Sequence, residues 1–465
     1  MKKTLYGTTA IVALGLAIVA ANPASAQAPA QGFSTTNFQF TVGGYARGFV
    51  GSVSNKLDNN PFGGAVFRGQ AANSNADTIS VGNINNGGID QQQDFRLDLT
   101  ARANLPNGMA AGMTAQMMVP NSGPAQGGSP TGSAGDSFLR RQWVFLSTAF
   151  GQVELGSIDA VITRMYAGPF DAFTAGGIAS MGGGAISNFA YSPLKSGQSD
   201  TPIAGTQVRF WDRSANKIAY VSPRIEGFQL GLNYTPESSN FRESTFLTGT
   251  FQAATGGISA YGGYQQGFAA ALNYTNSFSG FDVRAYAGYQ SWQAPVTGAL
   301  RGLKDPKVYG LGAGVRYMGF DLGASYSNFK DGVNVTRGTF MNVGGFSTTN
   351  ALLAVDGRAW DVGAGYIFGP AAVSLTYVDA RNSAGAVNVT TGVVTPQFFG
   401  DDKKQAIALS GRYTLGPGVN VEATGFWQKM TAGNGLNAAQ TAGGNVDQAR
   451  VAKSQGVVTG LILTF

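Results

Sequence analysis

The chain has 465 residues, of which 68 are glycine and none is cysteine or histidine, and its formal net charge is +6. Without cysteine there are no disulfides, and without histidine both Ser-His-Asp catalysis and histidine metal sites are excluded. We therefore expect no enzyme, cofactor or metal site, and the small charge excess gives no support for nucleic-acid binding.

The first segment carries the features of an export signal. Lys2 and Lys3 precede the apolar run 11–21, and Ala24-Ser25-Ala26 supplies a small-residue cleavage site. We predict a secretory signal peptide over residues 1–26 and a mature chain that is exported through the general secretory route. The apolar run is too short for a membrane anchor, and no later stretch reaches ~20 apolar residues. Any membrane character must therefore lie in alternating strands.

From residue 38 onward, apolar and polar residues alternate with the period of a strand that has two unlike faces. In residues 94–105, one parity holds Arg96 and Arg102, and the other holds only apolar side chains. An arginine on a lipid face costs about 2–4 kcal/mol, so the polar parity must face water. Almost every strand has the same small aliphatic outer face without a second layer to cover it, which favours lipid as the partner.

Successive strands are joined by tight turns rich in glycine and proline, for example at 318–319, 369–370 and 416–418. Together with a first strand over 38–50 and a closing strand, the hairpins give about sixteen strands. The long polar segments between hairpins are 51–90, 120–137, 158–216, 236–264, 293–306, 330–357, 381–402 and 430–454. Short turns at one end and long loops at the other are typical of outer-membrane barrels. We predict one all-β domain over 27–465, a transmembrane antiparallel β-barrel with short periplasmic turns, long extracellular loops and a lumen wide enough for water.

Aromatic residues recur at fixed places in these hairpins and predict two interfacial bands. Those beside the short turns are Tyr274, Tyr317, Tyr366 and Tyr413 before the turns and Phe228, Phe281 and Phe320 after them. Those of the opposite band are Tyr289, Tyr326, Tyr377 and Trp427. The glycine-rich run 310–314 lies in mid-strand without a following helix, so we interpret it as lumen-facing small residues instead of a phosphate loop.

The last ten residues continue the alternation to the chain end. Val457, Leu461, Leu463 and Phe465 share one parity, and the aromatic residue is terminal. This resembles the closing strand of bacterial outer-membrane barrels. The resemblance implies that Phe465 helps recognition by the barrel assembly machinery, and it places the protein in the bacterial outer membrane.

Two hairpins carry a more specific resemblance. In 213–234, Asn216, Tyr220, Ser222-Pro223 and Gly227-Phe228 precede an alternation that ends at Tyr234. This segment resembles the hairpin of strands six and seven in the general porins of Gram-negative bacteria, which follows their long third loop. Residues 141–156 resemble the hairpin before that loop. The resemblance implies a sixteen-stranded barrel, usually a homotrimer, whose third loop (roughly 158–190) folds inward and narrows the pore.

The resemblance also implies a charged constriction. In that family, acidic side chains of the loop face arginines of the early strands, and the charges set ion preference. Carried over, the acidic side is Asp159 and Asp171, and the basic side is Arg47, Arg96, Arg102 and Arg141. The loop is poorer in acids and richer in glycine than that of enteric members, so we expect an arginine excess at the constriction instead of strong cation selectivity.

Three functions fit the sequence. The first is a water-filled channel for passive diffusion of small hydrophilic solutes and ions. The second is a solute-selective channel of the same fold, for example one that prefers anions. The third is a non-conducting surface barrel. In each case the partners are outer-membrane lipid, further copies of the chain and the assembly machinery.

Overall fold

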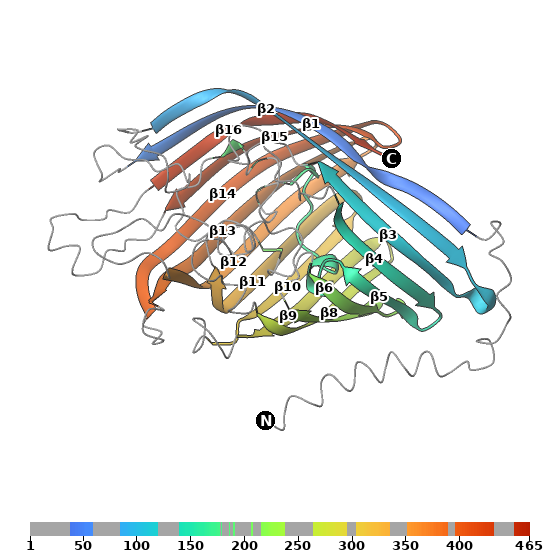
Figure 1. Ribbon diagram of the computed structural model, residues 1–465. Coiled ribbons are helices and arrows are strands. Elements are labelled where there is room, and N and C mark those ends of the chain that lie inside the picture. The colour runs from blue at the N-terminus through green and yellow to red at the C-terminus, as the bar shows by residue number, and fades with distance from the viewer. Residues whose placement is uncertain are drawn as a thin grey trace.

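The computed structural model describes residues 38–58, 84–119, 139–176, 178, 186, 189–190, 206–207, 215–237, 264–294, 304–334, 351–388, 396–431 and 451–465. Sixteen strands pair antiparallel in chain order, and β1 pairs with β16 to close the barrel (Figure 1). The strands are β1 (Phe38–Asp58), β2 (Ile84–Asn104), β3 (Ala110–Val119), β4 (Leu139–Thr148), β5 (Gly151–Ser157), β6 (Asn216–Val221), β7 (Phe228–Glu237), β8 (Gln265–Phe278), β9 (Phe281–Gln293), β10 (Lys307–Tyr317), β11 (Phe320–Asn334), β12 (Ala351–Phe368), β13 (Ala371–Asn388), β14 (Pro396–Gly416), β15 (Val419–Thr431) and β16 (Val451–Thr464). The short helices η3 (Pro106–Gly108) and α2 (Val161–Arg164) lie between strands in the described part of the chain.

The predicted signal peptide, residues 1–26, lies outside the described residues. Among the residues that the structure does describe, no helix is both long and apolar enough to cross a membrane.

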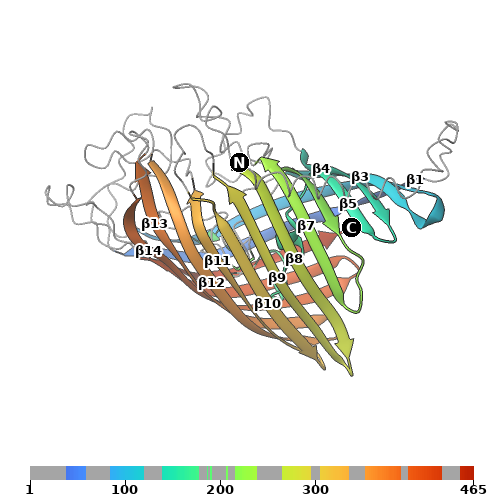
Figure 2. The same cartoon turned by 90° about the horizontal axis from the view of Figure 1, so that it is seen from below.

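The barrel wall buries polar side chains inside and exposes apolar ones outside. Leu322 and Leu409 on the outer face are 58% and 63% exposed, whereas Asp321 and Glu422 on the inner face are 0% exposed. Figure 2 shows β7 to β13 side by side in one such wall. A water-soluble barrel has the reverse distribution, so lipid is the solvent that suits this outer surface. The face assignment made from residues 94–105 is confirmed, since Leu99 on the apolar parity is 41% exposed.

Tight two-residue turns reverse the chain at one end of the barrel. Ser279 and Gly280 have φ of 49° and 86°, and Met318 and Gly319 have 48° and 86°. Positive φ at both central residues is the geometry that matches the twist of paired strands. The second position favours glycine because glycine has no Cβ atom and adopts positive φ without strain.

Aromatic side chains ring the outer face beside these turns, as the sequence predicted. Their rings pair across neighbouring strands, with centroids 4.0 Å apart for Phe281 and Tyr317 and 4.5 Å apart for Phe320 and Tyr366. Each pair is also directly opposite in the strand register. A second set, which we call the far aromatic band, lies toward the other end of the strands. Its members are Tyr289, Tyr309, Tyr326, Trp360, Tyr377 and Trp427.

Several strands run further than the sequence pattern predicted. β1 continues to Asp58 and β2 begins at Ile84, both inside the segment 51–90 that was predicted to be a loop. β13 likewise continues to Asn388, and β14 begins at Pro396. Beyond the lipid both faces of a hairpin meet water, so these ends need no apolar alternation and the predicted loop boundaries were wrong.

The chain end closes the barrel. Gly44 N–H donates to Phe465 O at 2.8 Å, and Phe465 N–H donates to Gly44 O at 3.2 Å. The Phe465 side chain is 53% exposed and its ring centroid lies 6.4 Å from that of Phe95. The terminal aromatic residue is therefore on the outer face, as its parity predicted.

Candidate functional site

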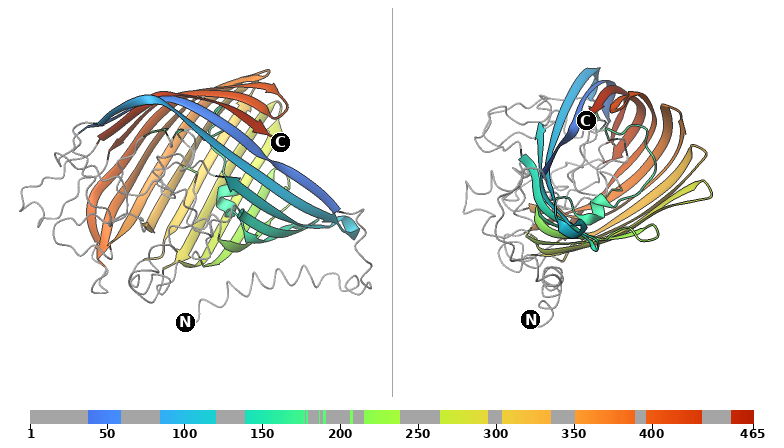
Figure 3. Two further views of the ribbon diagram at one scale, coloured as in Figure 1. Left: turned by 45° about the horizontal axis from the view of Figure 1, so that its top comes forward. Right: turned by 90° about the vertical axis from the view of Figure 1, so that its right-hand side faces the viewer.

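The connection after β5 lies inside the barrel. Its helix α2 contacts the inner faces of β7, β8 and β9, and Figure 3 shows it within the ring of strands. Val161 N–H donates to Asn233 Oδ1 of β7 at 2.8 Å, and Ile162 is fully buried in a cluster with Tyr286 and Trp292. The largest apolar core beside this wall is thus formed by a loop packed against the lumen side.

Glycines of the inner wall make room for the next residues of this connection. A Cβ atom on Gly323 would lie 2.9 Å from Pro169 Cα, and one on Gly363 would lie 2.8 Å from Pro169 Cβ. A Cβ atom on Gly312 would overlap Ala167 O. We call Gly312, Gly323 and Gly363 the glycine seat. Because Gly323 and Gly363 are directly opposite in the register of β11 and β12, the seat is continuous across strands.

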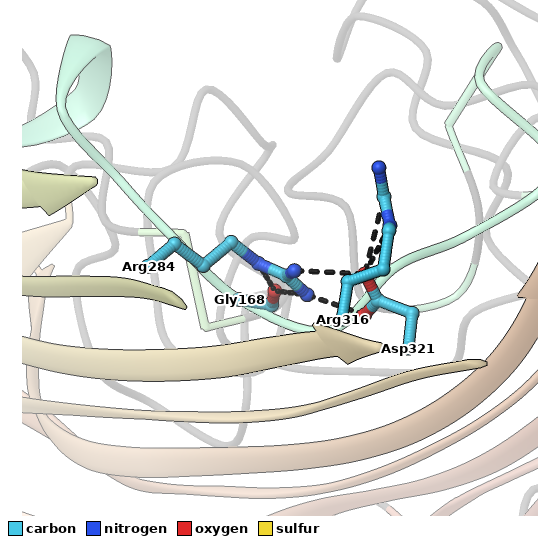
Figure 4. A network of polar contacts seen from close by, with 4 residues as sticks. All are labelled: Gly168, Arg284, Arg316 and Asp321. Carbon is cyan, nitrogen blue, oxygen red and sulfur yellow. Dashed lines mark hydrogen bonds and ion pairs between the residues drawn. The ribbon is translucent and has the colours of Figure 1, made fainter. Parts of the chain in front are cut away.

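A three-residue ion cluster fixes the loop on this seat (Figure 4). Arg284 of β9 donates to both carboxylate oxygens of Asp321 at 2.8 and 2.6 Å. The same guanidinium donates to Gly168 O of the loop at 3.1 and 3.0 Å. Arg316 of β10 donates to Asp321 at 3.1 Å. Asp321 is fully buried, so the two arginines neutralise a carboxylate that would otherwise be costly inside the protein.

Further polar contacts hold the loop as it continues around the wall. Ala172 N–H donates to Ser374 Oγ of β13 at 2.8 Å. Thr174 donates to the Glu422 carboxylate of β15 from its backbone N–H at 2.7 Å and from its hydroxyl at 2.6 Å. Arg47 of β1 reaches Ala175 O at 3.4 Å. The loop therefore follows the inner wall from β5 to β1, which confines it to the periphery of the lumen.

Two titratable groups of the loop are themselves buried. Burial raises the pKa of the Asp171 carboxyl above its ordinary value, although hydrogen bonds from Phe173 N–H and from Ser374 lower it in part. Burial also raises the pKa of the Tyr166 hydroxyl, which hydrogen-bonds to Ser325 of β11 at 2.7 Å. The tyrosine therefore stays neutral at any ordinary pH and acts as a hydrogen-bonding tether.

Of the basic residues predicted for the constriction, those on β1 and β2 are either paired with an acid or exposed. Arg47 Nη2 is 2.5 Å from Asp94 Oδ2 across β1 and β2, and Arg96 pairs with Asp98 on its own strand. Arg102 is exposed on β2. Arg47 and Arg96 are thus paired with strand acids that the sequence analysis had not assigned to the constriction.

The two predicted loop acids contact different parts of the barrel wall. Arg141 Nη2 lies 2.6 Å from Asp159 Oδ1, so this early-strand arginine and this loop acid do come together. Asp171 instead accepts a hydrogen bond from Ser374 of β13 at 3.3 Å. The structure thus brings together one of the predicted acid–arginine combinations and puts the other acid on the glycine-seat side of the lumen.

Within the inner-face ion pairs, the arginine is often more exposed than its acid. Arg164 is 33% exposed and its partner Glu154 is 2% exposed, while Arg316 is 37% exposed and Asp321 is not exposed. In these two pairs the guanidinium group meets the lumen and the carboxylate is covered, whereas Asp94 and Asp159 are more exposed than their partners Arg47 and Arg141. The lumen surface around Arg164 and Arg316 is consequently more cationic than a count of charges implies.

The contacts of Arg284, Arg316 and Asp321 with the loop were not predicted from the sequence. The glycine seat was not predicted either, although the run 310–314, which contains Gly312, was interpreted as lumen-facing. The signal available in the sequence was the recurrence of inward-parity glycine on three consecutive strands, at Gly312, Gly323 and Gly363.

Comparison with known proteins gives one family. A family model described as Gram-negative porin matches residues 8–449. Comparison with curated proteins finds no significant match. Among solved structures, the trimer form of in-vitro folded OmpT, an outer membrane protein from Vibrio cholerae, is 14% identical with a TM-score of 0.46, over 92% of this chain and 100% of that one. An anion-selective porin from Comamonas acidovorans is 16% identical with a TM-score of 0.42, over the same shares of the two chains.

Proposed function

We propose that this chain, which belongs to the Gram-negative porin family, forms a water-filled channel for passive diffusion of small hydrophilic solutes and ions across the outer membrane. The observation that carries this proposal is the exposure of charged groups inside a closed barrel. Arg96 and Arg316 are 34% and 37% exposed although both side chains face inward. Charged groups retain exposed surface in a membrane protein where they meet water, which favours a hydrated lumen.

We further propose that the constriction lies between the seated loop and the early strands. Its acidic side would be Asp159 and Asp171, and its basic side would be Arg47, Arg96, Arg102 and Arg141. The pairing of Arg141 with Asp159 supports this assignment. Asp171, which contacts β13, would contribute from the opposite wall. Residues 158–190 would then set the size limit of the pore.

A preference for anions is the second candidate function, and the exposure of the guanidinium groups favours it. Exposed arginines whose carboxylate partners are buried create a positive local potential, which raises the concentration of anions in a narrow lumen. Such a preference for anions does not require a binding site, because the positive potential acts on any anion without a cage of convergent hydrogen-bond donors.

The test is a recording of single channels from the refolded protein in a planar bilayer under a KCl gradient. We expect large current steps that are linear in voltage and salt, with a reversal potential shifted weakly toward chloride. Saturation of the current at high solute concentration would indicate a solute-selective channel instead of a diffusion pore. A folded barrel that does not conduct would support the non-conducting surface barrel.

Assembly and export are also proposals. Residues 1–26 would be removed as a signal peptide, residues 27–465 would form the single barrel domain, and three copies would associate as a homotrimer. Phe465 would be recognised by the barrel assembly machinery, which its exposed position beside β1 favours.

Replacing Phe465 with alanine should strongly reduce the amount of folded barrel in outer-membrane fractions of cells. The purified variant should still fold in detergent, because the backbone hydrogen bonds of Phe465 to Gly44 do not need the ring. The measurement is the heat-modifiable gel band in membranes and after refolding. Equal amounts of membrane-inserted variant and parent would exclude the role of the ring in recognition.

A further inference from the structure

A phenylalanine of the inward loop lies between two arginines of the barrel wall. The Cζ atoms of Arg316 (β10) and Arg412 (β14) are 5.7 and 6.0 Å from the centroid of the Phe170 ring. The ring lies on β12, midway between these strands, since a Cβ atom on Gly365 would overlap Phe170 Cδ1. The two guanidinium groups therefore reach the ring from opposite sides. We call Phe170, Arg316 and Arg412 the arginine–aromatic cluster.

The arginines of this cluster are not those of the proposed constriction, which lie on β1, β2 and β4. Arg316 and Arg412 each directly precede an outer-face tyrosine beside a short turn, so they lie toward that end of the barrel. The loop acid next to Phe170, Asp171, is bonded to Ser374 of β13. A solute in the lumen therefore meets this cluster separately from the constriction arginines.

Arg316 keeps donors for the lumen although it forms an ion pair. A guanidinium group has five N–H donors, and Arg316 directs Nε and Nη2 to Asp321 at 3.1 Å. Asp321 is fully buried, whereas Arg316 is 37% exposed and extends toward the lumen (Figure 4). The exposed Asp282 is directly opposite Arg316 in the register, but it is bonded to Ser277 at 2.6 Å. The other N–H groups of Arg316 can therefore bind a solute.

Arg412 is compensated even less than Arg316. Its directly opposite neighbour on β15 is Glu422, a buried carboxylate that accepts hydrogen bonds from the backbone N–H and the hydroxyl of Thr174. Within the described part of the chain, the Arg412 guanidinium group makes no hydrogen bond, and it lies beside Phe170. Arg412 is partly exposed, so it presents a charge and a planar set of donors to the lumen.

A second ring of the inner wall shows that two neighbouring arginines alone do not make such a site. The Cζ atoms of Arg47 and Arg96 lie 4.4 and 5.6 Å from the ring centroid of Tyr45 on β1. Their partners Asp94 and Asp98 are themselves 19% and 22% exposed. A solute beside Tyr45 therefore meets both signs of charge, whereas the ion-paired carboxylate of the arginine–aromatic cluster is covered.

We infer that the arginine–aromatic cluster binds aromatic carboxylates within the lumen. Phe170 is partly exposed, and an aromatic solute can pack on its ring in an offset or edge-on arrangement. The guanidinium fork of Arg316 or Arg412 matches the two oxygens of a carboxylate. An inorganic anion would gain only the charge contact and a neutral aromatic solute only the ring contact. This inference rests on the proposed channel function and names a class of solute that the lumen favours.

The test measures how carboxylates interrupt the single-channel KCl current of the refolded full-length protein in a planar bilayer. Benzoate is compared with cyclohexanecarboxylate, which has the same charge and a similar size but no aromatic ring. We expect benzoate to block with about fivefold higher affinity than cyclohexanecarboxylate. Inorganic phosphate should block more weakly than benzoate. Raising the KCl concentration should weaken the block by both carboxylates, because exposed charges are screened.

Substitutions in the cluster separate the ring from the charge. Phe170→Leu should remove the preference for benzoate over cyclohexanecarboxylate, and Phe170→Tyr should keep it because the ring remains. Arg412→Gln should weaken the block by both carboxylates about fivefold. Tyr45→Leu is the matched control, since it removes the other ring between two arginines, and its preference for benzoate should equal that of the parent.

Equal block by benzoate and cyclohexanecarboxylate in the parent would overturn the inference, as would an unchanged preference in Phe170→Leu. A KCl current that benzoate does not interrupt would also contradict it and would leave the channel function intact. Absence of any KCl current would contradict the channel function itself. In that case saturation-transfer NMR of the two carboxylates with the barrel folded in detergent gives the same comparison, and equal binding there would overturn the inference.

Discussion

Arg284→Gln is expected to lower the free energy of unfolding by about 3 kcal/mol, because it removes one partner of a buried carboxylate. Asp321 is fully buried, and Arg284 supplies the hydrogen bonds to both of its oxygens at 2.8 and 2.6 Å. The substitution also removes the donor to Gly168 O, which holds the loop on the glycine seat. We take the lower end of the range for a broken buried pair because Arg316 still contacts Asp321.

The measurement is guanidinium-induced unfolding of the refolded barrel in detergent micelles. Arg316→Gln is the matched control, since its side chain is 37% exposed and its hydrogen bond to the cluster is the one to Asp321. It should cost about 1 kcal/mol. The double variant Arg284→Gln/Asp321→Asn should regain part of the stability, because no buried charge is left unpaired. Equal losses for the two single arginine variants would show that the bond to Gly168 does not stabilise the loop.

The outer wall of the barrel could be predicted because lipid imposes a rule on each residue. In β2, a shift by one residue would turn Arg96 and Arg102 to the lipid, so the alternation alone decides the face. The same rule gave the closing strand and the position of Phe465. It does not apply where both faces of a strand meet water, and for that reason the ends of β1 and β13 were not predicted.

The course of the loop could not be predicted for a different reason. Its contacts join residues more than a hundred positions apart, such as Gly168 with Arg284 and Thr174 with Glu422. Inward parity places Arg284 and Glu422 in the lumen, but any loop could reach them there. Glycine at inward positions of neighbouring strands limits the choice, because only a backbone that comes close to the wall needs the missing Cβ atoms. The constriction assignment, which came from a family resemblance, stays a prediction.

Gly312→Ala is expected to narrow the channel and to destabilise the barrel by about 1–3 kcal/mol, the usual cost of overpacking. The added methyl group would overlap Ala167 O, a backbone atom that cannot rotate away. β10 cannot yield easily, because it is paired along its length with both β9 and β11. The loop backbone must therefore move toward the centre of the lumen. Single-channel conductance should fall, with additional fluctuations as the contacts of Gly168 are lost.

Gly425→Ala is the matched control for this change. Gly425 is also a mid-strand glycine, but it has the outward parity of β15 and a Cβ atom there meets nothing within 4 Å. This variant should conduct like the parent and gain up to about 1 kcal/mol from the reduced freedom of the unfolded chain. A loss of stability in Gly312→Ala without a change in conductance would mean that the seated loop does not limit the pore. A fall in conductance confined to Gly312→Ala would connect the glycine seat with the size of the channel, because the two variants add the same methyl group on opposite faces of the wall.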